Sequence, residues 1–241
     1  TNSQSDRDAL QSEVSQLVSE IDRVAKTTTF NGQKILDGSF AGGVFQVGAN
    51  AGDNITVGGI SNAKAADLST VKYYSTSVST GTIVAATTGP AVPGYDTAIT
   101  TGLTVNGVDI GGIAAAASAE ERTGQVVAAI NAKTADTGVT AFVENGNFVL
   151  RSDNETLGVT LTGAGWGATS TGLVTVANTT AVANNATGTA AAKGIDSISV
   201  STQSDAWLAI KKVDSAIDTV NSARADLGAL QTRFERSVEN I

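Results

Sequence analysis

The chain has 241 residues, of which 41% are hydrophobic but only 5% aromatic, so any core must be mainly aliphatic. It contains no Cys and no His, which excludes Ser-His-Asp and Cys-His catalysis and removes the commonest transition-metal ligands. The formal net charge of −8 argues against nucleic acid or an anionic membrane as a partner.

Residues 5–25 have the pattern of an amphipathic helix. Ser3 or Ser5 is expected to cap it, and Asp6 favours the positive end of the helix dipole. The apolar residues recur at spacings of three and four and predict a single stripe, formed by Leu10, Val14, Leu17, Ile21 and Val24. Three successive β-branched threonines, residues 27–29, predict the end of this helix.

The stretch TTTFNGQKILDGSF, residues 27–40, contains two glycine-centred turns, Asn31-Gly32 and Asp37-Gly38. Turns of this kind reverse the chain, so a short hairpin-like segment is predicted after the first helix. Its apolar side chains are predicted to pack on the seam between the first and last helices: Phe30, Ile35 and Leu36.

The middle of the chain, from about residue 40 to 200, is rich in Gly, Thr, Ala, Val and Asn and predicts short strands between turns. Asn106-Gly107 has the composition preferred in two-residue hairpin turns, and residues 144–147 predict a similar turn. A helix capped by Ser118 is predicted to bury Val126, Val127, Ala129 and Ile130. The predicted elements are strands 44–47 and 55–57, hairpin 103–110, helix 118–134, strands 139–143 and 148–150, strand 159–161, and loops with short edge strands over 163–195.

The last segment carries the longest regular pattern. Thr202 or Ser204 is expected to cap a helix, and apolar residues then alternate at spacings of three and four, namely Ile210, Val213, Ile217, Val220, Leu227, Phe234, Val238 and Ile241. Such a heptad predicts a long helix whose seam packs on another helix, and the stripe on residues 5–25 is the predicted partner. Arg224 and Gln231 interrupt the apolar series, and Gln231 is interpreted as fixing the register.

These patterns predict an α+β protein with an elongated two-domain chain. Residues 1–70 and 197–241 are expected to form a discontinuous helical domain with a β-hairpin region, built from both ends. Residues 71–196 are expected to form an inserted, β-rich outer domain, which contains a hairpin-helix-hairpin module at about 103–162.

Four short motifs in this sequence resemble bacterial flagellin. They are EIDRV at residues 20–24, TFNGQKIL at 29–36, FQVGAN at 45–50 and ARADLGALQTRF at 223–234. The last motif departs from the family pattern at Thr232, where Asn is usual. The resemblance covers roughly residues 1–60 and 200–241, and the insert is similar to the hook-associated IN module of the family through Asn106-Gly107, Ile130-Asn131 and residues 138–141.

The resemblance implies a structural subunit of the extracellular flagellar filament, exported by the flagellar apparatus and polymerised with other flagellin subunits. An export chaperone and a cap protein are implied partners of the full-length protein. The chain is interpreted as a truncated core fragment without the terminal inner-core helices, and such a fragment is expected to stay monomeric.

The family resemblance also implies that Toll-like receptor 5 is a candidate partner. Glu13 matches a receptor-contact position on the first helix, with Leu10 and Gln16 about one turn to either side, and Arg233 matches another on the last helix. The alternative is that these residues only form a solvated helix surface. Because further contact residues of the family lie upstream of Thr1, weak or absent receptor signalling is expected from the fragment. Arg224 either extends to solvent or contacts a neighbouring subunit.

No enzyme is predicted, and no catalytic, cofactor-binding or metal-binding residues are assigned. Acidic residues in the turns have no EF-hand spacing, and the Gly-rich stretch at 163–167 does not lie between a strand and a helix as a phosphate loop would. The sequence contains no run of about 18 apolar residues, so no membrane span is predicted. The alternative function is a surface adhesin or carbohydrate-binding protein with a helical stalk.

Overall fold

The computed structural model describes residues 3–30, 32–46, 54–79, 94–153, 158–167, 169–173 and 190–240. Asn31, residues 47–50 and Ile241, which belong to the sequence patterns above, lie outside this part. The protein combines helices and sheets, and its contacts divide it into two compact units. Unit 1 comprises Thr1–Val71 and Ala192–Ile241, and unit 2 comprises Lys72–Ala191.

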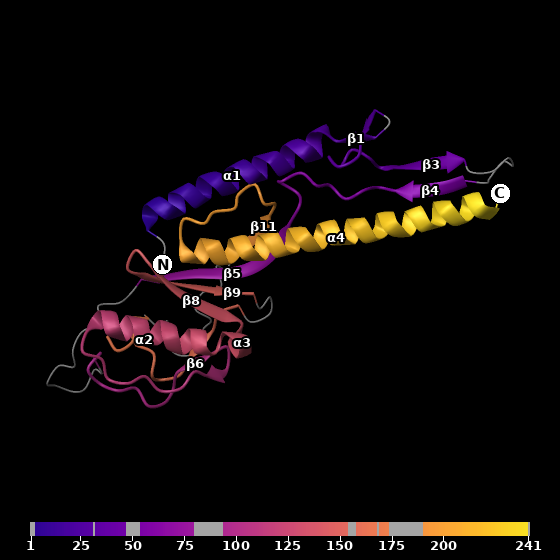
Figure 1. Ribbon diagram of the computed structural model, residues 1–241. Coiled ribbons are helices and arrows are strands. Elements are labelled where there is room, and N and C mark those ends of the chain that lie inside the picture. The colour runs from indigo at the N-terminus through magenta and orange to yellow at the C-terminus, as the bar shows by residue number, and fades with distance from the viewer. Residues whose placement is uncertain are drawn as a thin grey trace. The chain divides into compact units, whose positions relative to one another are not determined.

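Helices and strands follow one another in the order shown in Figure 1. The helices are α1 (Gln4–Thr27), α2 (Ala119–Ala132), α3 (Thr134–Thr137) and α4 (Gln203–Asn240). The strands are β1 (Thr29–Phe30), β2 (Gln33–Lys34), β3 (Gly42–Gln46), β4 (Asn54–Gly58), β5 (Thr70–Ser79), β6 (Thr104–Val105), β7 (Val108–Asp109), β8 (Val139–Glu144), β9 (Asn147–Ser152), β10 (Leu161–Thr162) and β11 (Ala190–Lys193).

Both long helices begin at caps that the sequence predicts. The Ser3 hydroxyl accepts from the Asp6 backbone N–H at 3.2 Å, and the Asp6 carboxylate accepts from the Ser3 backbone N–H at 3.1 Å. The two bonds satisfy N–H groups that have no partner within α1. The Asp6 carboxylate also accepts from the Ser3 hydroxyl at 2.7 Å, and this bond is the largest cause of the lowered pKa of Asp6. At the start of α4, the Thr202 hydroxyl accepts from the Asp205 N–H at 3.1 Å, so Thr202 supplies the capping bond.

Unit 1 has a small core of mostly small side chains. It consists of Ala65, Leu68, Ile195 and Ala216, with Val18, Ala63 and Ile198 packed against it. Val18 comes from α1 and Ala216 from α4, so the two helices meet through the segments around Ala65 and Ile195. Gln11 adds a polar contact, because its amide donates to the Ile198 carbonyl at 3.0 Å and accepts from the Val200 N–H at 2.7 Å.

The predicted seam between the two long helices is wrong. Ala209, Lys212 and Ala216 are the buried positions in this part of α4, whereas Ile210, Val213 and Ile217 are exposed. The buried face thus precedes the predicted stripe by one residue, which is a rotation of about 100° around an α-helix. On α1 the shift has the opposite sense, because Val18 and Ala25 lie toward the core and each follows an exposed stripe residue, Leu17 at 60% and Val24 at 43%.

The segment after α1 forms the predicted hairpin. β1 and β2 pair antiparallel with Phe30 opposite Gln33, and the next turn holds Gly38 at a φ of 79°. A Cβ at Gly38 would lie 2.8 Å from the Asn62 amide nitrogen, so both the backbone angle and the space favour glycine there. The predicted packing of Phe30 on the helix seam is wrong, since Phe30 is 66% exposed.

Strands β3 and β4 form the second predicted hairpin of unit 1. They pair antiparallel from Gly42 opposite Gly58 to Gln46 opposite Asn54. Ile55 and Val57 of β4 are buried and alternate with exposed residues, as expected for a hairpin with one covered face.

Unit 2 contains the predicted hairpin-helix-hairpin module. β6 pairs with β7 and β8 pairs with β9, and α2 lies between the two hairpins in sequence. Val126 and Ile130 of α2 are fully buried, with Val127 and Ala129 partly buried against the same core. The Ser118 hydroxyl accepts from the Glu121 N–H at 3.2 Å and caps α2 as predicted. The third predicted strand begins two residues later than expected, as β10, which pairs with β6.

Two features of unit 2 were not predicted. β5 pairs with β9 and lies inside the sheet of order β11-β5-β9-β8, although its sequence was not assigned to a strand. Arg122 of α2 is 0% exposed, and its guanidinium donates to the backbone carbonyls of Tyr95 and Thr97. Desolvation lowers the pKa of Arg122, partly offset by the charge of Asp96. These bonds hold residues 95–97 against α2.

Candidate functional site

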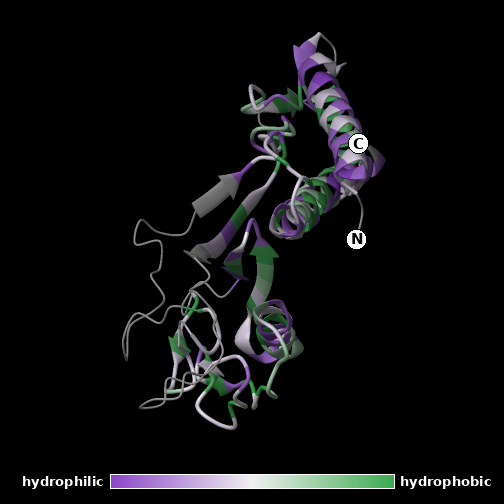
Figure 2. Ribbon diagram, turned by 90° about the vertical axis from the view of Figure 1, so that its left-hand side faces the viewer, coloured by the Kyte–Doolittle hydropathy of each residue, from purple (hydrophilic) through white to green (hydrophobic). Residues whose placement is uncertain are grey.

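The most unusual surface of unit 1 consists of apolar side chains on its two long helices. We define the α1 apolar face as Leu10, Leu17, Ile21 and Val24, and the α4 apolar face as Ile210, Val213, Ile217, Val220 and Leu227. All nine are exposed, with Leu17 at 60% and Ile210 at 63%. Figure 2 shows apolar and polar residues interleaved along both helices.

Each long helix has two adjacent stripes, and only one of them packs against the small core of unit 1. The inner stripe of α4 carries Ala209 and Ala216, whose small side chains let neighbouring segments approach closely, and Lys212, whose ammonium donates to the Ser197 hydroxyl. The larger Ile and Val side chains are left on the adjacent face. Repeated large apolar side chains at heptad spacing on an exposed face are typical of a surface that another helix or subunit covers.

The EIDRV motif at the end of α1 divides its residues between these two faces. Asp22 accepts from the Ala65 N–H at 3.2 Å and pairs with Lys26 at 2.5 Å, so it ties α1 to the small core. The hydrogen bond from Lys26 is the largest cause of the lowered pKa of Asp22. Ile21 and Val24 belong to the α1 apolar face. The motif therefore combines an anchor with part of the exposed surface.

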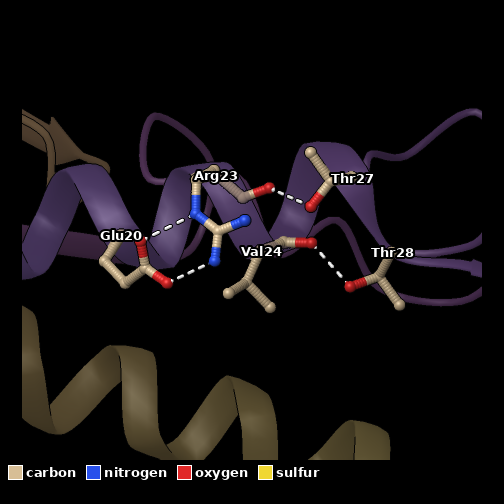
Figure 3. A network of polar contacts seen from close by, with 5 residues as sticks. All are labelled: Glu20, Arg23, Val24, Thr27 and Thr28. Atoms are coloured by element: carbon tan, nitrogen blue, oxygen red, sulfur yellow. Dashed lines mark hydrogen bonds and ion pairs between the residues drawn. The ribbon is translucent and has the colours of Figure 1, made fainter.

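Figure 3 shows the polar contacts that finish α1. Arg23 donates to the Glu20 carboxylate with two nitrogens, at 2.8 and 2.5 Å. The Thr27 hydroxyl donates to the Arg23 carbonyl at 2.8 Å, and that of Thr28 donates to the Val24 carbonyl at 2.6 Å. The two threonines thus end α1 and satisfy carbonyls of its last turn.

A second feature of unit 1 is an apolar groove where the hairpins meet the distal half of α4. Its volume is about 490 Å³, and it is lined by Phe30, Gln33, Ile35, Phe40, Phe45, Val57, Ile60, Leu227, Leu230 and Phe234. Phe45 of β3 and Phe234 of α4 make an edge-to-face contact with ring centroids 5.8 Å apart. Ile35 thus lines a groove with residues of the hairpins and α4, and no residue of α1 is among the lining, which corrects its predicted position on the helix seam.

A smaller groove of about 280 Å³ lies between β4 and α4. Asp226 and Arg233 are among its lining residues, together with backbone from Thr56 to Ser61. Arg233 therefore combines high exposure with a place beside the hairpin.

The predicted contact residues on α1 all lie on its surface. Leu10 is 42% exposed, and Glu13 and Gln16 are also exposed. Gln16 lines a shallow depression that includes Ser12 and Arg23. Their exposure is compatible both with a binding surface and with a solvated helix surface.

The predicted contact residues on α4 lie far from those on α1. Arg224 and Arg233 are exposed. Gln231, interpreted from the sequence as fixing the register, is also exposed, and its amide donates to Glu235 of the same helix at 2.9 Å. The contacts of Gln11 with residues 198–200 and of Val18 with the core of Ala216 show that the helices run in the same direction. Glu13 is five residues before Val18 and Arg233 is 17 after Ala216. At 1.5 Å per residue, the two are separated by roughly 33 Å along the helices.

Two further charged residues hold unit 1 together and were not singled out from the sequence. Lys212 is 2% exposed, its ammonium donates to the Ser197 hydroxyl at 2.7 Å, and desolvation lowers its pKa. Asp67 pairs with Lys193 and accepts from the Asn62 amide at 2.7 Å; the bond from Lys193 is the largest cause of its lowered pKa. No sequence pattern distinguishes these residues from solvated ones.

Two other kinds of feature, a metal-binding cluster and a membrane-crossing helix, are not found in the described residues. Within them, no cluster of three acidic side chains has the arrangement needed to hold a metal ion. Among the described helices, none combines the length and hydropathy that a membrane crossing requires.

Comparisons with known proteins identify two regions. The bacterial flagellin N-terminal helical region matches residues 1–41, and the flagellin hook IN motif matches residues 102–154. The first match spans α1 and the β1–β2 hairpin, and the second spans the hairpin-helix-hairpin module.

Whole-chain relatives agree with these two matches. Flagellin B of Vibrio anguillarum is 30% identical over all of this chain and 58% of its own length. A flagellin of Clostridium tyrobutyricum is 30% identical over all of this chain and 61% of its own length. The solved structure titled "3D structure of FliC from Burkholderia pseudomallei" is 24% identical, with a TM-score of 0.49, and the match covers 97% of this chain and 87% of that one. The chain spans about three fifths of the length of the curated relatives it matches. From the two family regions and the alignment of the whole of this chain with the Vibrio and Clostridium flagellins, we conclude that the chain belongs to the bacterial flagellin family, a family of structural proteins.

Proposed function

We propose that this chain is part of a structural subunit of the bacterial flagellar filament, an extracellular polymer used for swimming. The observation that carries the proposal is the pair of exposed apolar faces on α1 and α4. Burying one large aliphatic side chain contributes about 1.5–3 kcal/mol, so nine partly exposed ones form a substantial driving force for association. Other flagellin subunits are the proposed partners.

We also propose that the two units of the chain have different roles. Unit 1, which adds residues 71 and 192–196 to the expected 1–70 and 197–241 and carries both apolar faces, is the proposed filament domain. Unit 2 is the proposed outer domain with its surface-exposed antigenic face. The export chaperone and the cap protein are proposed partners of the full-length protein. The faces bear large apolar residues in a heptad pattern, which supports helix-to-helix contact as their use.

The filament proposal is tested by charging one face in the full-length protein. Ile210→Asp combined with Ile217→Asp is expected to abolish or shorten filaments in electron micrographs, because two carboxylates would be buried at the interface. The matched control is Asp214→Ser with Asp218→Ser, which changes exposed polar positions of the same helix. Circular dichroism is used to check that both variants remain helical. Normal filaments from the Ile variant would contradict the proposal, and a parent protein that stays monomeric under filament-forming conditions would favour a surface adhesin with a helical stalk.

Toll-like receptor 5 is a second proposed partner, with Leu10, Glu13, Gln16 and Arg233 as candidate contacts. Their exposure supports it. The expected result is that Glu13→Lys in the full-length protein lowers receptor signalling in reporter cells, with Glu20→Lys as the control on the same helix. Equal signalling by the parent and Glu13→Lys would leave Glu13 as an ordinary solvated residue.

A further inference from the structure

Unit 2 contains the same dipeptide in two turns of nearly the same shape. Asn106-Gly107 joins β6 to β7, and Asn145-Gly146 joins β8 to β9. The φ angles are 50° and 82° in the first turn and 51° and 74° in the second. Positive φ at both central residues defines the type I′ turn that Asn-Gly favours. The two asparagines therefore differ mainly in what surrounds their side chains.

The side chain of Asn106 is held in place. Its amide nitrogen donates to the carbonyls of Thr137 at 2.8 Å and Gly158 at 3.0 Å. Its amide oxygen accepts from the Thr160 N–H at 2.8 Å. Three hydrogen bonds thus fix the carboxamide away from the following peptide bond and tie the turn to two other segments.

The side chain of Asn145 has no comparable hydrogen bonds within the described part of the chain. Asn145 is exposed at the tip of the β8–β9 hairpin, and its carboxamide makes no hydrogen bond to any residue in the described part of the chain. Only its backbone carbonyl has a contact, as acceptor from the Asn147 amide at 3.5 Å. Its carboxamide can therefore rotate toward the nitrogen of the next residue.

We propose that Asn145 is a site of spontaneous deamidation and that Asn106 is protected by its three hydrogen bonds. In this reaction the deprotonated backbone nitrogen of Gly146 attacks Cγ of Asn145, a new N–Cγ bond forms, and the Cγ–Nδ2 bond breaks. The leaving amide takes up a proton from water and departs as ammonia, which leaves a five-membered succinimide. Water then adds to either ring carbonyl and opens the ring to aspartate or to isoaspartate, so no oxidant or reductant is needed. Glycine at the next position favours ring closure because it has no Cβ.

The two products have different structural effects. Aspartate is accepted in a type I′ turn before glycine, so it adds one negative charge and leaves the hairpin intact. Isoaspartate carries the main chain through the side-chain carbon and lengthens the backbone by one atom, so the pairing of Glu144 with Asn147 is lost. Either product places a carboxylate next to Glu144 on the surface of unit 2.

The test compares the two sites in one sample of the folded chain. The protein is incubated at mildly alkaline pH, digested, and mapped by mass spectrometry, with isoaspartyl methyltransferase labelling to separate the products. The peptide with Asn145 is expected to convert at least about tenfold faster than the peptide with Asn106, since breaking two or three hydrogen bonds of about 0.5–1.5 kcal/mol each is required at Asn106. In concentrated urea, where these bonds are absent, the two sites are expected to convert at similar rates.

Two outcomes would overturn the proposal. One is equal conversion of both sites in the folded chain. The other is conversion of Asn145 in urea but not in the folded chain, which would mean that the turn itself prevents ring closure. The variant Asn145→Gly keeps a sequence suited to type I′ turns, and it is expected to remove the mass change from the hairpin peptide without altering the Asn106 peptide. Asn31-Gly32 is quantified separately, because Asn31 lies outside the described residues.

Discussion

Ala216 and Ile217 are neighbours in α4, yet Ala216 is 6% exposed and packs in the small core while Ile217 is 52% exposed. The helix therefore presents a small residue inward and a large one outward. This arrangement is the reverse of what burial by size alone would favour, and it means that the folded unit 1 and the α4 apolar face depend on different residues.

The first prediction separates these two roles. Ala216→Leu is expected to lower the free energy of unfolding by about 1–3 kcal/mol, because Ala216 is 6% exposed and the added carbons would have to displace side chains packed around it. Ile217→Ser is expected to change it by less than about 0.5 kcal/mol, since Ile and Ser have similar helix propensities and the site is exposed. Urea unfolding followed by far-UV circular dichroism measures both. A larger loss for Ile217→Ser would mean that the α4 apolar face is covered within the chain.

The second prediction concerns Gln11. Gln11→Ala removes two hydrogen bonds to the segment before α4 and is expected to cost about 1–3 kcal/mol of stability. Gln11→Glu keeps an acceptor for the Val200 N–H but loses the donor to the Ile198 carbonyl, so an intermediate loss is expected. Gln16→Ala is the matched exposed control, with little expected change. Thermal unfolding distinguishes the three, and equal stability of the Gln11 and Gln16 variants would exclude a role for Gln11 in joining the two parts of unit 1.

The third prediction concerns the buried Arg122. Arg122→Ala opens a cavity and removes both guanidinium bonds, and a loss of roughly 3 kcal/mol is expected. Arg122→Met fills most of the space and removes the desolvated charge, so its loss is expected to be about 1 kcal/mol or less. Both carbonyls lose their bond from Arg122 in either variant, but the Tyr95 carbonyl keeps its bond from the Ala116 N–H, whereas the Thr97 carbonyl has no second partner among the described residues. Chemical denaturation of both variants gives the comparison, and the reverse order of stability would show that the charge itself stabilises unit 2.

The fourth prediction is a pH dependence. The pKa of Asp22 is lowered from 3.8 in the folded protein, chiefly by the hydrogen bond from Lys26. A carboxylate with a lowered folded pKa stabilises the protein above its unfolded pKa, and this stabilisation is lost as the pH falls through the folded pKa. Asp22→Asn is therefore expected to be less stable than the parent at neutral pH, with a difference that shrinks below about pH 3.8. Urea midpoints across this range test it, with Asp218→Asn as an exposed control; a difference that does not depend on pH would assign the effect of Asp22 to packing.

Much of the secondary structure follows from local patterns. The Ser3 and Thr202 caps, the threonines after α1 and the Asn-Gly turns each act through bonds or angles within a few residues, so the sequence predicts them well. β5 was missed because its run of Ser, Thr and Tyr lacks strong alternation, although its β-branched and aromatic residues were an available signal.

The face of each helix that is buried could not be predicted in the same way. A heptad pattern identifies apolar side chains that can pack on another helix, but it does not show whether that helix belongs to the same chain. In α4 the covered face is chosen by close approach around Ala209 and Ala216, which depends on segments distant in sequence. The burial of Lys212 and Arg122 has the same origin, because their partners are backbone or hydroxyl groups that no spacing rule identifies.

The contacts of Gln11 also bear on the order in which the chain folds. Its two partners lie 187 and 189 residues later in the sequence, whereas unit 2 is one continuous segment, Lys72–Ala191. Closing so long a loop costs entropy before any contact offsets it, and topologies rich in such distant contacts fold slowly. Unit 2 is therefore expected to fold early. Its folding shortens the effective loop that must close before α1 can contact residues 198–200. Unit 1 is therefore expected to be the last part of the chain to fold.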